Sequence, residues 1–179
     1  MRSGEWRQYK AVRLNGEHYG GWYQQNDEML DWIKEHKLAS PVTCLGDGHD
    51  GVWNIFSLLG FKRERREILD WYHLKENLYK QPLEKEQLKE LETDLWNGRI
   101  DKVLEKLEEK NNFRKYVLKH SERIVNYNYY KKEGITIGSG AVESAVKQIS
   151  ARLNLPGARW KEENANKMIA FRCTYLNST

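Results

Sequence analysis

Hydrophobic positions follow a strand-like period near the N-terminus and a helical period over most of the remaining chain. The opening EWRQYKAVRL alternates polar and apolar side chains, and NGEHYGGW comes next. This pattern predicts a strand, an Asn-Gly turn and a return strand through His18, Tyr19 and Trp22. DEMLDWIKEHKL then has apolar residues at helical spacing, which predicts a helix capped by Asn26 or Asp27.

Two short apolar runs follow, and each is predicted to be a strand. VTCLGDG comes after Pro41, and its closing glycines are typical of a buried strand that ends in a turn. REILDWYH is the second run. Between them, GVWNIFSLLG predicts a short helix with Gly60 at its C-terminal end.

Residues 74–132 have a different character, because amphipathic helical patterns fill them, with breaks at Asn97-Gly98 and Asn111-Asn112. GITIGSG then predicts a return to a strand and a turn. A helix to about Leu153, a loop at NLPGARW and a last helix at KEENANKMIAFRC complete the chain. The pattern as a whole predicts an α/β fold, with a small mixed sheet flanked by helices and an all-helical insertion.

Composition narrows the class of protein. Of the 179 residues 39% are hydrophobic, with seven Trp and ten Tyr, so a folded chain is expected. Lys and Arg number 30 against 26 Asp and Glu, an excess of 4 that permits a polyanionic partner without requiring one. No run approaches the roughly 20 apolar residues of a membrane span, and no secretory signal opens the chain, so a cytoplasmic protein is expected. Cys44 and Cys173 are far apart, which indicates neither a disulfide framework nor a paired-cysteine metal site.

Three acids stand at the ends of the predicted strands: Asp47, Asp70 and Glu143. Strand ends are where an α/β sheet presents its chemistry. Gly46 and Gly48 flank Asp47, so the backbone can turn sharply and a ligand can come close to it.

Glu143 follows a Gly-Ser-Gly turn in which Ser139 is the expected helix N-cap, so Glu143 falls in the first helical turn. A carboxylate at that position also stabilises a helix by about 0.3–1 kcal/mol, which is an alternative role for Glu143. Carboxylates gathered at one edge repel each other, and a hard cation such as Mg²⁺ offsets that repulsion. Two such ions support phosphodiester chemistry.

Three separated motifs resemble the catalytic core of bacterial insertion-sequence transposases of the Kra group: LGDGHDGVWN, ILDWYHLKENL and IGSGAVESAVKQISARLNLPGARWKEENANKMIAFRC. These enzymes are relatives of the Mutator-like DDE transposases and have a ribonuclease-H-like fold. The motifs occur in the family's order, and the resemblance covers nearly the whole chain. It implies a DDE transposase catalytic domain, which cleaves DNA with bound metal and transfers the new strand to a target.

The resemblance also assigns residues. Asp47 corresponds to the second acid of the Asp-Asp-Glu triad and Glu143 to the third, and both are expected to be catalytic metal ligands. Asp70 and His73 match the family's supporting Asp-x-x-His motif. The implied organisation is a catalytic core in two parts with a helical insertion between them: 1–73, 74–132 and 133–179.

The chain departs from the family pattern at its start. The family's first Asp lies on a strand upstream of the segment that EWRQYKAVRL matches, and no Asp precedes Asp27, which has a helix-start context. We therefore expect the first strand and its acid to be missing and the chain as given to be inactive. Mg²⁺ or Mn²⁺ is expected only in the complete enzyme. The resemblance further implies double-stranded DNA as partner, at element ends and target, together with a homo-oligomeric full-length enzyme and a nucleoid-associated location in the bacterial cytoplasm.

Four basic residues after Glu143 are candidates for contacts with DNA phosphates: Lys147, Arg152, Arg159 and Lys161. A solvated helix face explains them equally well. Asp50, in the same turn as Asp47, is an alternative ligand, although the flanking glycines favour Asp47. His49 and His73 lack partners at zinc-site spacing. The alternative functions are a non-catalytic DNA-binding remnant and another ribonuclease-H-like nuclease.

Overall fold

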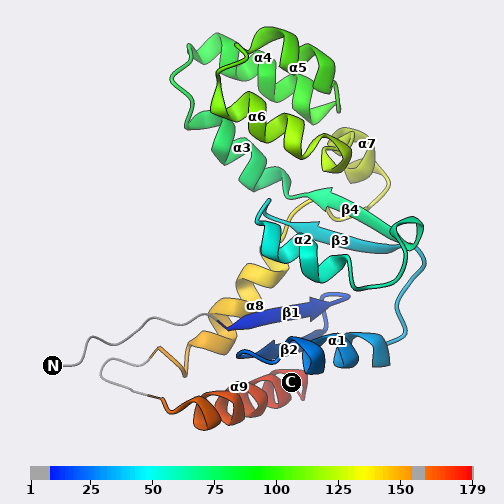
Figure 1. The fold of residues 1–179 in the computed structure, drawn as a ribbon, viewed down its shortest axis with the longest axis vertical. Coiled ribbons are helices and arrows are strands. Elements are labelled where there is room, and N and C mark those ends of the chain that lie inside the picture. Colours follow the sequence, from blue (N-terminus) through cyan, green and yellow to red (C-terminus); the bar gives the residue numbers. More distant parts are fainter. Residues whose placement is uncertain (1–8, 155–159, 179) are drawn as a thin grey trace, which may run out of the picture. The chain divides into compact units, whose positions relative to one another are not determined.

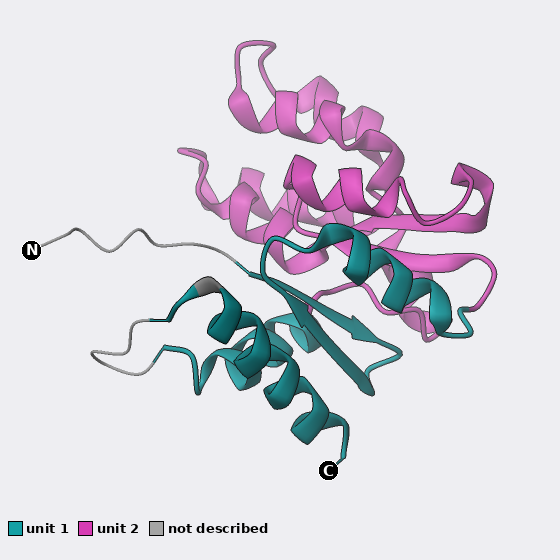
Figure 2. Ribbon diagram, turned by 60° about the horizontal axis from the view of Figure 1, so that its bottom comes forward, with its two compact units in different colours: residues 1–38, 140–179 teal, residues 39–139 magenta. Residues whose placement is uncertain are grey.

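The computed structural model describes residues 9–154 and 160–178, and the chain divides into two compact units. Unit 1 comprises residues 1–38 and 140–179, and unit 2 comprises residues 39–139 (Figure 2). The described residues form a mixed α/β structure that is mostly helical, with nine α-helices and two two-stranded sheets (Figure 1). Within these ranges no helix has both the length and the apolar character that crossing a bilayer requires.

Unit 1 contains the predicted hairpin, formed by β1 (Lys10–Leu14) and β2 (His18–Trp22). The strands are antiparallel, and Leu14 pairs with His18. Asn15 and Gly16 have positive φ angles of 53° and 74°, and the Glu17 amide donates a hydrogen bond to the Leu14 carbonyl at 3.0 Å. Two consecutive left-handed residues give a turn whose twist suits a hairpin, so the Asn-Gly prediction is confirmed.

Three helices pack on this hairpin: α1 (Asn26–Glu35), α8 (Gly140–Ser150) and α9 (Glu162–Asn177). Helix α8 contacts β1, while α9 and α1 contact β2. Adjacent glycines of β2 show that the helices cover opposite faces. A Cβ atom on Gly21 would lie 2.6 Å from Cγ2 of Ile169 on α9, and one on Gly20 would lie 3.1 Å from the Trp32 ring on α1. The core on the α8 and α9 side contains Tyr19, Tyr23, Ala145, Ile149, Ile169 and Cys173.

Unit 2 begins with the parallel strands β3 (Val42–Gly46) and β4 (Arg65–Leu69). The strands pair in register from Val42 and Arg65 to Gly46 and Leu69. Helix α2 (Asp50–Phe56) and the 3-10 helix η1 (Lys62–Glu64) connect them. The first predicted buried strand and the short helix after it are therefore confirmed.

A group of helices completes unit 2, and Figure 1 shows them together at one end of that unit. They are α3 (Trp71–Tyr79), α4 (Lys85–Trp96), α5 (Ile100–Lys106), α6 (Asn112–Lys119), η2 (Ser121–Arg123) and α7 (Tyr127–Lys132). Both predicted helix breaks are confirmed. Gly98 has a φ of 68° after α4, and the Asn111 side chain caps α6 by accepting hydrogen bonds from the amides of Phe113 and Arg114.

Several sequence predictions were wrong in detail. The segment DWYH is not strand, because β4 ends at Leu69 and α3 begins at Trp71. GITIGSG is irregular, and its carbonyl at Ile137 accepts a hydrogen bond from the Trp71 amide at 2.9 Å instead of joining a strand ladder. Gln25 precedes α1 without a side-chain capping bond, so neither Asn26 nor Asp27 is its cap.

The described strands form two separate two-stranded sheets in place of the single small mixed sheet that the sequence predicts. The mixed α/β class is thus confirmed at the level of its elements. Within the predicted NLPGARW loop, residues 155–159 lie outside the described ranges.

Candidate active site

Asp47 and Asp70 emerge at one edge of the parallel sheet in unit 2. The register ends at the pair Gly46 and Leu69, and the two acids are the next residues of their strands. The Asp70 amide donates a hydrogen bond to the Gly46 carbonyl at 2.8 Å, which carries the ladder one step further. Because carboxyl ends of parallel strands present side chains at the same edge, this is the position at which α/β proteins place ligand-binding groups.

Asp70 is fully buried and caps helix α3. One carboxylate oxygen, Oδ1, accepts hydrogen bonds from the amides of Tyr72 and His73 at 2.7 Å and 3.0 Å. Oδ2 accepts from the Ser139 amide, and the Ser139 side chain also donates to the carboxylate. Burial by itself raises the pKa of Asp70, but these hydrogen bonds outweigh burial and hold the pKa below its ordinary value. Asp70 is therefore a structural acid whose oxygens are already engaged.

The imidazole ring of His73 lies beside Asp70, but its Nδ1 makes no hydrogen bond to the carboxylate. Its Nδ1 is 3.5 Å from Oδ1 of Asp70, and within the described residues this buried nitrogen has no hydrogen-bond partner. The 3.5 Å separation is a close electrostatic approach only, since hydrogen bonds of this kind are usually 2.7–3.2 Å long. His73 therefore contacts Asp70 through its backbone amide, which donates to Oδ1, while its ring adds only a close approach.

Asp47 is exposed, in contrast to Asp70. Its Oδ1 accepts a hydrogen bond from the His49 amide at 2.9 Å, a local turn that holds the side chain near its own backbone. Among the described residues, Oδ2 has no hydrogen-bond partner. Gly48 has a φ of 98°, a conformation that favours glycine. One outward carboxylate oxygen at a strand end suits a hard cation that keeps most of its water ligands.

Asp50, the alternative ligand, is engaged by a lysine. It forms an ion pair with Lys119 of α6 at 2.7 Å, and this hydrogen bond lowers the pKa of Asp50. The pairing leaves Asp47 as the more available carboxylate of the turn, as its flanking glycines suggest.

Tyr116 of α6 also reaches this edge, and sequence reasoning missed it. Its hydroxyl lies 3.4 Å from the Asp47 carbonyl oxygen. Burial raises the pKa of Tyr116, a contact with Asn77 lowers it, and the charges of Asp47 and Asp70 raise it further. The amphipathic pattern of the insertion marks Tyr116 only as a core residue, so no local signal identifies this contact.

The remaining predicted site residues belong to unit 1. Glu143 is an exposed residue in the first turn of α8, as predicted. Lys147 lies on α8, Arg152 follows that helix, and Lys161 directly precedes α9; all three are exposed. Arg159 lies outside the described residues.

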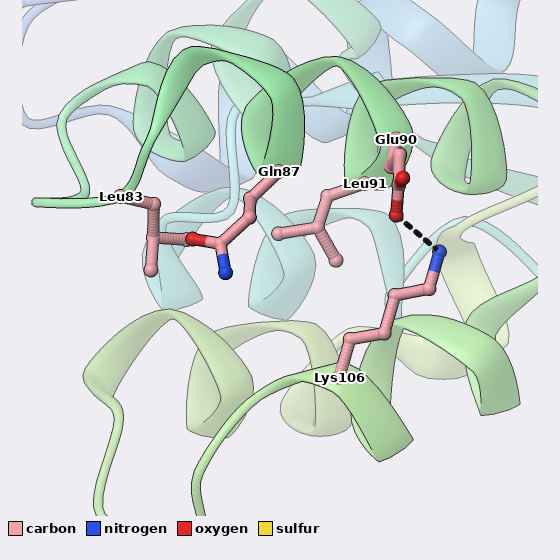
Figure 3. Close-up of a pocket in the computed structure, with 5 residues that line it drawn as sticks. All are labelled: Leu83, Gln87, Glu90, Leu91 and Lys106. Atoms are coloured by element: carbon pink, nitrogen blue, oxygen red, sulfur yellow. Dashed lines mark hydrogen bonds and ion pairs between the residues drawn. The ribbon is translucent and has the colours of Figure 1, made fainter.

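A separate small cavity of about 180 Å³ lies in the helical insertion, where the helices α4 and α5 meet (Figure 3). It is lined by Leu83, Gln87, Glu90, Leu91 and Lys106. Lys106 pairs with Glu90 at 3.3 Å and with Asp94 at 2.8 Å. Since its charged side chains pair with each other, this cavity is a weaker candidate for chemistry than the acidic edge.

No protein-family model, curated protein or solved structure matches the chain. The resemblance to Kra-group transposases therefore stays a prediction carried by the three motifs.

Proposed function

We propose that this chain belongs to the catalytic core of a DDE transposase with a ribonuclease-H-like fold. Such a core cleaves DNA at the ends of a mobile element and joins the resulting 3′-hydroxyl to target DNA. The observation that carries the proposal is the in-register parallel pair of β3 and β4, after which Asp47 and Asp70 emerge at one edge. Asp47 is exposed and flanked by glycines, which supports a role in ligand binding at this edge of the sheet and not in packing alone.

The two acids of this edge have different roles in the proposal. The Asp70 carboxylate holds the start of α3 by accepting hydrogen bonds from the amides of Tyr72 and His73. Its own amide links the ends of β3 and β4 by donating to the Gly46 carbonyl. Asp47, which is exposed, presents its second carboxylate oxygen, Oδ2, to a ligand. By the family resemblance, Asp47 and Glu143 are the residues that hold Mg²⁺ or Mn²⁺. The metal, when bound, supplies electrostatic stabilisation to the reacting phosphate.

Weak Mn²⁺ binding at Asp47 tests the proposal. One or two carboxylates without the complete ligand set bind a divalent ion weakly, and paramagnetic line broadening in NMR spectra detects such rapidly exchanging occupancy. We expect Mn²⁺ to broaden the amide signals of Asp47 and His49 selectively. Asp47→Asn should abolish this broadening.

Asp50→Asn is the matched control, because it removes the same charge from the same turn but from a residue that pairs with Lys119. Selective broadening at Asp47 should persist in Asp50→Asn, because the Asp47 carboxylate is intact in this variant. Equal broadening in Asp47→Asn and the unmodified chain contradicts the metal role of Asp47. If Glu143→Gln leaves the broadening unchanged, Glu143 is a helix-start acid only.

A non-catalytic DNA-binding remnant is the second candidate. The observation that favours it is the engagement of Asp70, which has hydrogen bonds to both carboxylate oxygens and leaves Asp47 as the more available acid of this edge. This candidate predicts salt-dependent DNA binding without Mn²⁺ broadening at Asp47 in the unmodified chain.

A further inference from the structure

The turn that presents Asp47 is short and rich in glycine, so its own backbone does little to hold it in one conformation. Gly46 and Gly48 flank the acid, and Gly48 is in the left-handed region at a φ of 98°. Glycine has the largest backbone freedom of any residue. Contacts from outside the turn therefore supplement the one local hydrogen bond to the carboxylate, which the His49 amide donates to Asp47 Oδ1 at 2.9 Å.

Helix α6 supplies such contacts although it follows the turn by more than 60 residues in sequence. Tyr116 lies directly over Gly48: a Cβ atom there would be 2.7 Å from the Tyr116 hydroxyl and 3.1 Å from its ring. One helical turn later, Lys119 pairs with Asp50 at 2.7 Å. Two residues on the same face of α6 thus contact both ends of the turn.

The position of the Tyr116 ring is itself determined by its neighbours. The ring lies 4.7 Å from the ring of His120, which is buried, and 6.2 Å from the ring of Phe113 (centroid distances). The ring also belongs to the same core as Leu74 and Leu78 of α3, the helix that Asp70 caps. Tyr116 therefore links the turn after β3 to the helix after β4.

We propose that Tyr116 is a positioning residue for Asp47, through which the helical insertion holds the acidic turn in its ligand-binding conformation. The inference rests on the proposed role of Asp47 as a metal ligand. The ring makes the larger contribution, since it packs on Gly48. The hydrogen bond to the Asp47 carbonyl is long at 3.4 Å and adds a smaller one.

Hydrogen exchange at the His49 amide tests the inference without any metal, because this amide donates to the Asp47 carboxylate and reports on the turn. Tyr116→Phe keeps the ring and removes the hydroxyl. We expect exchange at His49 to become about two- to threefold faster, the effect of losing one weak hydrogen bond. Tyr116→Leu also removes the ring and should give a larger increase, on the order of tenfold. The Mn²⁺ concentration that half-broadens the Asp47 signal should rise in the same order.

Tyr79→Phe is the matched control. Tyr79 is another tyrosine of the helical group, and its hydroxyl makes a shorter hydrogen bond, 2.6 Å, to Glu92. It should leave exchange at His49 unchanged. Unchanged exchange in both Tyr116 variants overturns the inference, and so does an equal increase in Tyr116→Phe and Tyr79→Phe, since that indicates general loosening of the helices.

The two proposals fail in different ways. If the unmodified chain shows no Mn²⁺ broadening at Asp47, Asp47 is not a metal ligand. Tyr116 then has no metal ligand to position. Exchange at His49 still measures whether Tyr116 holds the turn. If broadening is present and Tyr116→Leu changes neither exchange nor broadening, the metal role stands and the positioning role is overturned.

Discussion

The backbone amide of Asp70 donates a hydrogen bond to the carbonyl oxygen of Gly46 at 2.8 Å. This bond extends the parallel ladder beyond the last strand pair and brings Asp70 level with the point at which Asp47 leaves β3. From there the two side chains differ, since Asp70 is buried as the cap of α3 and Asp47 is exposed. One acid thus maintains the edge of the sheet while the other remains available for a ligand.

Asp70→Asn should destabilise unit 2 strongly. The carboxylate accepts hydrogen bonds from several donors in a buried site, and an amide presents an NH₂ group to some of those donors. We expect the free energy of unfolding to fall by about 2–3 kcal/mol. Urea denaturation with hydrogen exchange in α3 measures the loss. Asp47→Asn is the control and should change stability by less than about 0.5 kcal/mol, because Asp47 is exposed. Equal stabilities of the two variants contradict the capping role.

The stability of the chain should depend on the ionisation of Asp70 at low pH. Its pKa in the folded state lies below its ordinary value, whereas in the unfolded chain it is about 3.9. Its contribution is therefore fully present above the unfolded pKa and is lost as the pH falls through the folded pKa. The difference in unfolding free energy between the unmodified chain and Asp70→Asn should shrink below about pH 4. A difference that is constant down to strong acid excludes Asp70 as the titrating group.

DNA binding through the basic residues of unit 1 should be salt-dependent. If Lys147, Arg152, Arg159 and Lys161 each neutralise one phosphate, log K falls against log salt with a slope of about −3.6. The double variant Lys147→Gln, Lys161→Gln should reduce the slope to about −1.8. Fluorescence anisotropy with a labelled duplex measures both slopes.

A matched double variant tests whether the loss of any two positive charges would lower the salt slope of DNA binding to the same extent. Lys62→Gln, Lys80→Gln removes two lysines of unit 2 that pair with Glu122 and Glu76. Its slope should stay near that of the unmodified chain. If both double variants change the slope equally, the basic residues of unit 1 are a solvated face without a specific role.

Both cysteines should react slowly in the folded protein. Cys44 and Cys173 are buried, and burial raises the pKa of each thiol to about 11. The reactive thiolate is then a very small fraction near neutral pH and increases as the pH rises toward that value. Mass spectrometry after iodoacetamide treatment should find both thiols unmodified in the native protein and alkylated in denaturant. Rapid native labelling of either cysteine contradicts its burial.

Local sequence signals were sufficient for several elements of this fold. Asn15 and Gly16 produce the hairpin turn because their own backbones tolerate positive φ, and Gly98 and Asn111 mark real breaks between helices for similarly local reasons. The sequence also identified the acids at the strand ends. Glycines flank Asp47 and an apolar run precedes Asp70, and both signals come from residues next to the acid in sequence.

Contacts between distant residues decided the rest. Residues 71–73 have a strand-like pattern, but the Asp70 side chain caps the chain into helix α3, and Ser139 completes that cap from 69 positions away. The Ile137 carbonyl likewise accepts a hydrogen bond from the Trp71 amide, at the start of α3, and not from a neighbouring strand. Periodicity reports which side chains are buried and not which ones meet across the chain. The contact between Tyr116 and the Asp47 turn therefore emerges only in the tertiary structure, where α6 brings a partly buried tyrosine to the turn after β3.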